Sequence, residues 1–129
     1  SQLNVFGITP SPTQTKFLKK YWPGAVSVIL PCQDLNLEFL HRGTSSLAVR
    51  MPNNKLLKDL IDITGPLIAP SCNPEGLPPA INPEEAKKYF GNKIKLYVDG
   101  DEIKTNPSTL VSLLNGTPIV LRGILPTSS

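Results

Sequence analysis

The pattern of apolar and polar residues along the chain predicts three helices. In residues 55–63, KLLKDLIDI, five apolar side chains fall on one side, which predicts an amphipathic helix. Residues 13–21 predict a second helix, because a serine cap and a proline at the first helical position precede them. A third helix is expected over residues 83–90, between an asparagine cap and a terminating glycine.

Short apolar runs between these segments predict strands. Val26 to Leu30, VSVIL, is rich in β-branched residues and predicts a strand buried on both faces. Further strands are expected at Leu47–Met51, Leu67–Ala69, Ile94–Val98, Thr109–Leu113 and Ile119–Leu121. Residues 34–42 fit neither pattern clearly. Strands interleaved with helices predict an α/β or α+β fold whose sheet has mixed direction.

The length and composition narrow the class of protein. A chain of 129 residues is expected to form a single domain, 1–129, with a real core. Its 40% hydrophobic and 18% charged residues are typical of a globular protein. No apolar run approaches the roughly 20 residues that a membrane helix needs, and the first residues lack the pattern of a secretory signal. We therefore expect a cytoplasmic protein with no membrane partner.

Cysteine, histidine and net charge limit the chemistry further. Cys32 and Cys72 lie far apart and His41 is the one histidine, so no zinc site of the usual spacing can form. Two free thiols in a reducing compartment are expected. The net charge of +3 and the pI near 9.0 suit a polyanion such as a nucleotide or RNA. The basic residues themselves are scattered along the sequence.

Polar residues lie in or beside several predicted strands. Arg50 lies within LAVRM and Arg122 follows IVL, and an arginine near a core needs an anion. An internal carboxylate for each is the simpler interpretation, and a bound anion is the alternative. Ser71 and Asn73 form either a self-bonded turn or a ligand site, and Ser108 either starts a strand or contacts a ligand. No catalytic triad, phosphate-binding glycine loop or acid pair is found.

The order of these segments adds a resemblance. The series YWPGAVSVIL, LAVRMP, GPLIAPSCNPEG, NPSTLVSL and IVLRG resembles the YrdC-like family, the threonylcarbamoyl-AMP synthases. In that family the series is WPGPLT, V-A-V-R-x-P, GPL-x-APSAN-x-SG, PST-V-V-D and LR-x-G. The similarity extends from Tyr21 to Gly123 and rests on five motifs in order. It implies a twisted mixed sheet flanked by helices, with a wide basic cleft.

The resemblance also implies an activity. Members of the family make L-threonylcarbamoyladenylate from L-threonine, bicarbonate and ATP, and release pyrophosphate. The product serves the threonylcarbamoyladenosine modification of tRNA. ATP, with magnesium, is then a substrate, and no tightly bound cofactor is implied. Expected partners include tRNA or tRNA-modification proteins.

Six residues match positions that bind substrates in the family. The resemblance assigns to the threonine site Arg50, Ser71 and Ser108. It assigns to the nucleotide site Ser46, Asn73 and Arg122. Arg50 is expected to pair with the threonine carboxylate and Arg122 to face the ATP phosphates. No residue is assigned as a catalytic base, because positioned cations and hydrogen-bond donors suit a reaction that joins anions.

The chain departs from the family pattern at several positions. Glu75 and Pro79 replace residues that contact ATP in the family, and a carboxylate near phosphates repels them. Cys72 stands in place of alanine and Ser112 in place of aspartate. The family's N-terminal motifs are not found, so the chain is expected to be the larger C-terminal part of one YrdC-like domain. On this view it binds ATP weakly by itself.

Two other functions stay open. The first is a non-catalytic YrdC-like module that binds RNA or protein through its basic cleft, with the steep salt dependence typical of phosphate contacts. The second is the YrdC-like domain of a carbamoyl-transferring maturation enzyme. The absence of flanking zinc-finger cysteines counts against the second.

Overall fold

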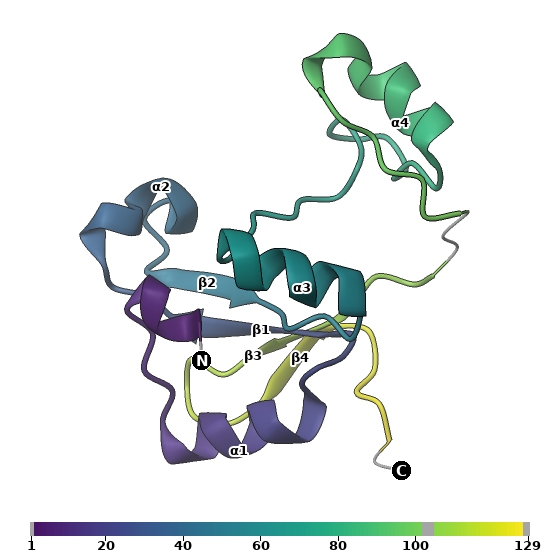
Figure 1. Ribbon diagram of the computed structural model, residues 1–129. Coiled ribbons are helices and arrows are strands. Elements are labelled where there is room, and N and C mark those ends of the chain that lie inside the picture. Colours follow the sequence, from purple (N-terminus) through teal and green to yellow (C-terminus); the bar gives the residue numbers. More distant parts are fainter. Residues whose placement is uncertain (1, 102–104, 128–129) are drawn as a thin grey trace. The chain divides into compact units, whose positions relative to one another are not determined.

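A computed structural model describes residues 2–101 and 105–127 of the chain (Figure 1). The chain divides into two compact units. These are Ser1–Leu67 with Pro107–Ser129, and Ile68–Asn106. The expectation of a single domain over residues 1–129 stays a prediction.

The first unit is built on a four-stranded sheet in the order β2-β1-β3-β4. The strands are β1 (Val26–Pro31), β2 (Ser46–Val49), β3 (Thr109–Ser112) and β4 (Ile119–Arg122). β1 pairs in parallel with β3, whereas the outer strands are antiparallel to their neighbours. The predicted mixed sheet is therefore confirmed, with four of the six expected strands in it.

One face of this sheet forms the hydrophobic core. Val26, Val28 and Leu30 of β1 are fully buried, as is Val111 of β3. They pack with residues of helix α1 (Pro12–Tyr21) and of the segment before it, namely Ile8 and Leu18. The alternate residues of β1 are only half-buried. The prediction that this strand is buried on both faces is therefore wrong, because the core packs against one face.

A buried glutamine links helix α1 to the end of the sheet at which β3 finishes. Ser11 caps the helix by accepting the Gln14 N–H, and Gln14 Oε1 accepts the Ser11 N–H at 2.8 Å, which completes a capping box. The same side chain donates from Nε2 to the Leu113 carbonyl at 3.0 Å. One residue thus fixes both the start of α1 and its position on β3.

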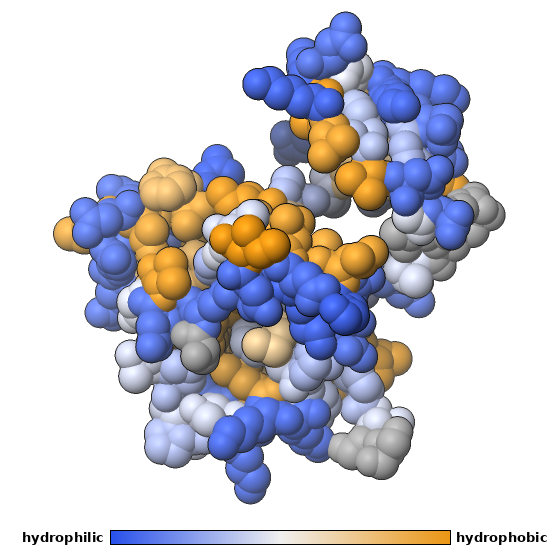
Figure 2. Space-filling model, viewed as in Figure 1, coloured by the Kyte–Doolittle hydropathy of each residue, from blue (hydrophilic) through white to orange (hydrophobic). Residues whose placement is uncertain are grey.

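Helix α3 (Lys55–Thr64) confirms the predicted amphipathic helix and is capped by Asn54. Figure 1 shows α1 below the sheet and α3 above it in this view. Four apolar side chains of α3 are exposed, whereas Ile61 is half-buried, and Figure 2 shows hydrophobic surface along the helix. The four are Leu56, Leu57, Leu60 and Ile63. Amphipathic spacing predicted the helix correctly but not the burial of its apolar side.

The ambiguous residues 34–42 form a 3₁₀ turn (Leu35–Leu37) and the short helix α2 (Glu38–His41). His41 is buried, and its Nδ1 accepts the Gly43 N–H at 3.2 Å while Nε2 lies 3.3 Å from the Asp34 carbonyl. These contacts make His41 a structural residue of the turn that leads into β2.

The second unit contains helix α4 (Pro83–Phe90) and a 3₁₀ turn (Gly91–Lys93). The predicted helix is confirmed: the Asn82 side chain accepts the Glu85 N–H at 2.9 Å. None of the helices in the described part of the chain has the length and apolar character needed to cross a bilayer.

Two predicted strands are wrong. Residues 67–69 and 94–98 join no ladder in the described structure. In the second segment Leu96 and Val98 are exposed, whereas Tyr97 is half-buried and donates to the Gly91 carbonyl at 2.8 Å. Alternating apolar residues favour an extended backbone, but a strand also needs a neighbour for its N–H and C=O groups.

We expect Gln14→Ala to lower the free energy of unfolding by about 1–3 kcal/mol, because it leaves the buried Leu113 carbonyl and the Ser11 N–H without partners. Ser11→Ala removes only the cap and should cost about 1 kcal/mol. Thr13→Ala, on the exposed side of α1, is the control and should change stability by less than about 0.5 kcal/mol. Urea unfolding followed by circular dichroism measures all three. Equal effects of Gln14→Ala and Thr13→Ala would contradict the tethering role.

Candidate functional site

Three of the six predicted site residues meet at one end of the sheet. β1 and β3 begin at this end, and the antiparallel β2 and β4 finish there. Arg50 directly follows β2, Ser108 directly precedes β3, and Arg122 is the last residue of β4. The strand order therefore gathers residues from distant parts of the sequence.

Arg50 is held by a backbone carbonyl next to the start of β1. Its Nε donates to the Gly24 carbonyl at 2.9 Å, and the Gly24 N–H donates to the Met51 carbonyl at 2.9 Å. The side chain is exposed, and its terminal nitrogens have no partner among the described residues. Because a carbonyl orients a guanidinium without neutralising it, Arg50 keeps its full charge for another anion.

Arg122 is held in the same way beside the start of β3. Its Nε and Nη2 both donate to the Ser108 carbonyl, at 3.1 Å and 3.0 Å. The residue is exposed, and within the described chain Nη1 has no partner. The two arginines thus reach the ends of the two central strands, whose backbones lie about 5 Å apart in a sheet.

Neither arginine has a carboxylate partner in the part of the chain that the structure describes. There the one ion pair joins Lys55 Nζ to Asp59 Oδ2 at 2.6 Å on the exposed side of α3. The simpler interpretation, an internal carboxylate for each arginine, is therefore wrong for residues 2–101 and 105–127. The sheet end carries two oriented, uncompensated positive charges.

A pair of hydroxyl groups lies between the arginines. Ser27 Oγ of β1 and Ser108 Oγ lie 2.8 Å apart across the two central strands. One hydroxyl donates to the other, which leaves one O–H and free lone pairs for a ligand. Ser27 was not among the site residues predicted from the sequence. Two signals could have found it: it is the polar residue inside VSVIL, and the WPGPLT motif has a hydroxyl residue at its position.

Two glycines allow the backbone to pass close to this site. A Cβ on Gly24 would lie 2.6 Å from the Tyr21 carbonyl oxygen. Gly123, next to Arg122, has φ 75°, and a Cβ there would meet Thr109 Oγ1 at 3.0 Å and its Cα at 3.2 Å. The glycines of the WPG and LRG segments are therefore required by close packing, since there is no room for a side chain.

Ser46 lies at the opposite end of β2. It pairs with Pro31 at the end of β1, and its Oγ donates to Thr44 Oγ1 at 3.3 Å. The structure therefore does not bring Ser46 together with Arg50, Ser108 and Arg122. Two residues that are four positions apart along a strand are separated by about 13 Å.

Ser71 and Asn73 belong to the second unit. Asn73 Nδ2 donates to the Pro74 carbonyl at 3.0 Å, but its Oδ1 is buried and has no hydrogen-bond partner. The Ser71 residue is exposed, and its hydroxyl makes no hydrogen bond with the described residues. Hydrogen bonding within the turn thus satisfies the Nδ2 group of Asn73 but not its Oδ1 atom. A buried acceptor without a donor costs about 1–3 kcal/mol, so the turn alone does not explain the orientation of this amide.

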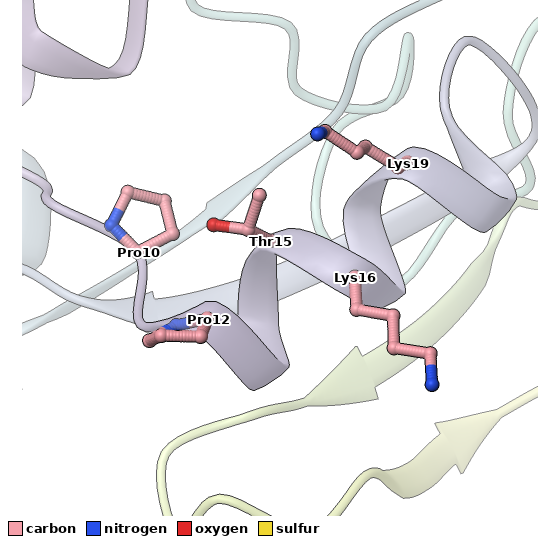
Figure 3. Close-up of a pocket in the computed structure, with 5 residues that line it drawn as sticks. All are labelled: Pro10, Pro12, Thr15, Lys16 and Lys19. Atoms are coloured by element: carbon pink, nitrogen blue, oxygen red, sulfur yellow. The ribbon is translucent and has the colours of Figure 1, made fainter.

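The part of the chain that the structure describes holds no metal cluster at the sheet end. Among the described residues, no three His, Cys, Asp or Glu side chains are grouped so as to hold a metal ion. Both cysteines are free, Cys32 buried and Cys72 exposed. An open cavity of about 480 Å³ lies instead on α1, lined by Pro10, Pro12, Thr15, Lys16 and Lys19 (Figure 3). The sheet end is therefore a surface site made of charges and hydroxyl groups.

A comparison with protein families matches residues 2–123 to the Sua5/YciO/YrdC family, described as "Telomere recombination". Curated relatives named threonylcarbamoyl-AMP synthase include one from Pyrococcus abyssi, 32% identical over 119 residues, which are 89% of this chain and 35% of the relative. Another, from Cellvibrio japonicus, is 34% identical over 105 residues, 80% of this chain and 56% of the relative. The chain thus spans between about a third and just over half of these relatives.

Solved structures support the fold. The P. abyssi Sua5 protein in complex with L-threonine superposes with a TM-score of 0.81 at 30% identity, covering 94% of this chain and 36% of that protein. Escherichia coli YciO gives a TM-score of 0.73 at 23% identity, covering 94% of this chain and 60% of that protein, a likeness of fold alone. The expected YrdC-like fold is confirmed.

We expect Gly24→Ala to lower the free energy of unfolding by more than about 1 kcal/mol, because the new Cβ displaces the loop that holds Arg50. Gly100→Ala is the matched control, since a Cβ there meets nothing within 4 Å, and it should change stability by less than about 0.5 kcal/mol. Chemical denaturation of both variants measures the difference. If Gly24→Ala is as stable as Gly100→Ala, close packing at the WPG segment is not required.

Proposed function

The chain belongs to the Sua5/YciO/YrdC family, and on this basis we propose that it carries substrate-binding residues of a threonylcarbamoyl-AMP synthase. The reaction converts L-threonine, bicarbonate and ATP into threonylcarbamoyl-AMP and pyrophosphate. Two relatives with that name support the proposal, as does the likeness to a threonine-bound Sua5 structure.

The observation that carries the proposal is the pair of oriented arginines without carboxylate partners at one sheet end. The threonine amine and bicarbonate form a carbamate with loss of water, and a carbamate oxygen then bonds to the α-phosphorus of ATP as pyrophosphate leaves. Bicarbonate, the carbamate and the ATP phosphates all carry negative charge, so the anions that must approach one another repel. Fixed cations offset this repulsion and orient the groups without a general base.

Each residue of the sheet end has a role in this proposal. Arg50 pairs with the threonine carboxylate through its free terminal nitrogens, a geometry that suits a planar guanidinium. Arg122 faces the phosphates, and its bond to the Ser108 carbonyl sets its direction. The Ser108 hydroxyl contacts threonine. Ser27 joins this set as the residue that orients the Ser108 hydroxyl.

The family motif assigns a ligand to each of the remaining residues separately. Asn73 offers its unpartnered Oδ1 to an N–H donor of the nucleotide, and the Ser71 hydroxyl binds threonine. Ser46 is assigned to the nucleotide by the family motif alone. The exposed Glu75 lies two residues from Asn73, and its negative charge lowers affinity for phosphates. We therefore expect weak nucleotide binding.

The proposal also includes a metal ion, a cellular compartment and the partners that receive the product. Mg²⁺ is bound by few carboxylates and by substrate phosphates, so it arrives as part of the ATP complex. The reaction is placed in the cytoplasm, which agrees with two free cysteines. The product is passed to tRNA modification, so tRNA and the proteins that modify it are the proposed partners.

The three arginines of the chain provide an internal test. In a ¹⁵N-labelled sample, their Nε–Hε signals report on each guanidinium separately. We expect L-threonine to shift the Arg50 signal and magnesium-ATP to shift the Arg122 signal, whereas neither ligand shifts Arg42. Affinities in the millimolar range, about −4 kcal/mol, are expected for sites built from a few contacts.

Reciprocal variants separate the two arginine roles. Arg50→Lys should weaken threonine binding about ten- to hundredfold, the worth of a charge-assisted hydrogen bond, and leave the ATP shift of Arg122 unchanged. Arg122→Lys should do the reverse. Equal shifts at all three arginines would show non-specific charge effects and overturn the proposal. So would the absence of any shift at Arg50 and Arg122 at saturating millimolar ligand.

A further inference from the structure

The register of the sheet places four residues in one row across the sheet end. Ser27 of β1 pairs with Leu110 of β3, and Leu110 pairs in turn with Arg122 of β4. On the other side of β1, Ser27 and Arg50 come one position beyond the last pair of the β1–β2 ladder. Neighbouring strands are about 5 Å apart. A serine and a leucine therefore lie between the two arginines.

Ser27 and Leu110 lie on the face of the sheet opposite the hydrophobic core. Along β1 and β3 they alternate with Val26, Val28 and Val111, which are fully buried. Both are half-buried, and neither belongs to the core cluster of the described residues. Core packing therefore does not explain why one position is a serine and the other a leucine.

The middle of the row offers neutral hydroxyl groups, whereas its two ends are charged. Ser27 Oγ lies 2.8 Å from Ser108 Oγ, and among the described residues neither hydroxyl has another hydrogen-bond partner. The free terminal nitrogens of Arg50 and Arg122 are the better partners for carboxylate and phosphate oxygens, because they carry charge. The hydroxyl pair then suits a neutral ligand group that both donates and accepts a hydrogen bond, such as another hydroxyl.

Leu110 adds an apolar surface beside the hydroxyl pair. It is the direct partner of Ser27 across the two central strands, and it lies two residues after Ser108. Residues two positions apart in a strand share a face of the sheet. A ligand group at this point therefore meets hydroxyl groups and apolar carbons side by side. A carbon atom that carries one hydroxyl and one methyl group matches both kinds of contact.

We infer that Ser27 and Leu110 determine which amino acid the site accepts, by recognising the two groups on the β-carbon of threonine. Ser27 is a positioning residue, because it orients the Ser108 hydroxyl toward the threonine hydroxyl. Leu110 contacts the methyl group. Valine has no hydroxyl and serine has no methyl group, so threonine should bind more tightly than either. The inference rests on the proposed function, because it needs the amino acid carboxylate at Arg50.

The test measures the affinity of the ¹⁵N-labelled chain for L-threonine, L-serine and L-valine from the Nε–Hε signal of Arg50. In Ser27→Ala, affinity for threonine and serine should fall about two- to tenfold, the worth of a net hydrogen bond. Affinity for valine should stay within about twofold. In Leu110→Ala, affinity for threonine and valine should fall about fourfold, the worth of one buried CH₂ group. Affinity for serine should not change.

Two further variants serve as controls. Ser27→Thr keeps the hydroxyl and should keep the selectivity of the wild type. Ser112→Ala removes another half-buried serine, which pairs with Ile29 on the same face of the sheet. It should change no affinity by more than about twofold. Urea unfolding of every variant shows that a loss of binding is not a loss of folding.

The pattern over the three amino acids separates the possible failures. Equal loss of all three in Ser27→Ala would mean that the hydroxyl pair binds the carboxylate or amine that they share. That result, or selectivity that is unchanged in both alanine variants, would overturn the inference and leave the proposed function standing. If none of the three amino acids shifts the Arg50 signal of the wild type, the proposed function is wrong, and the inference is wrong with it.

Discussion

The parallel pairing of β1 with β3 determines where everything else in the first unit lies. These strands are more than eighty residues apart in sequence, yet Val26 pairs with Thr109 and Val28 with Val111. Because side chains alternate, this register sends the valines into the core and Ser27 and Ser108 to the other face. A slip of one residue would bury the hydroxyls and expose the valines.

The same pairing sets the chemistry of the sheet end. It places two backbone carbonyls, of Gly24 and Ser108, at the starts of adjacent strands, and each accepts an arginine N–H. Had a carboxylate taken either place, Arg50 or Arg122 would be both oriented and neutralised. A carbonyl supplies the orientation and leaves the charge, which is the condition for binding an anion at low reorganisation cost.

Local signals in the sequence predicted the local features and not the partners. The caps at Ser11 and Asn82 were predictable because a short polar side chain and the backbone that it bonds are neighbours in sequence. The predictions of strands at 67–69 and 94–98 were wrong because strand pairing depends on residues far away in the chain. The same reason explains why α3 was predicted but the exposure of its apolar side was not. Motifs singled out Arg50 and Arg122, and the WPGPLT motif also marks the position of Ser27, but the pairing of Ser27 with Ser108 needed the strand register.

The position of the excess positive charge follows from where the lysines lie on α1 and not from the net charge of the chain. A net charge of +3 spread over the surface would be largely screened beyond about 8–10 Å at physiological salt. Lys16, Lys19 and Lys20 instead all lie on the single helix α1. Lys20 is only four residues from Gly24, whose carbonyl holds Arg50. The segment that carries the excess charge therefore leads directly into the end of the sheet at which Arg50 lies.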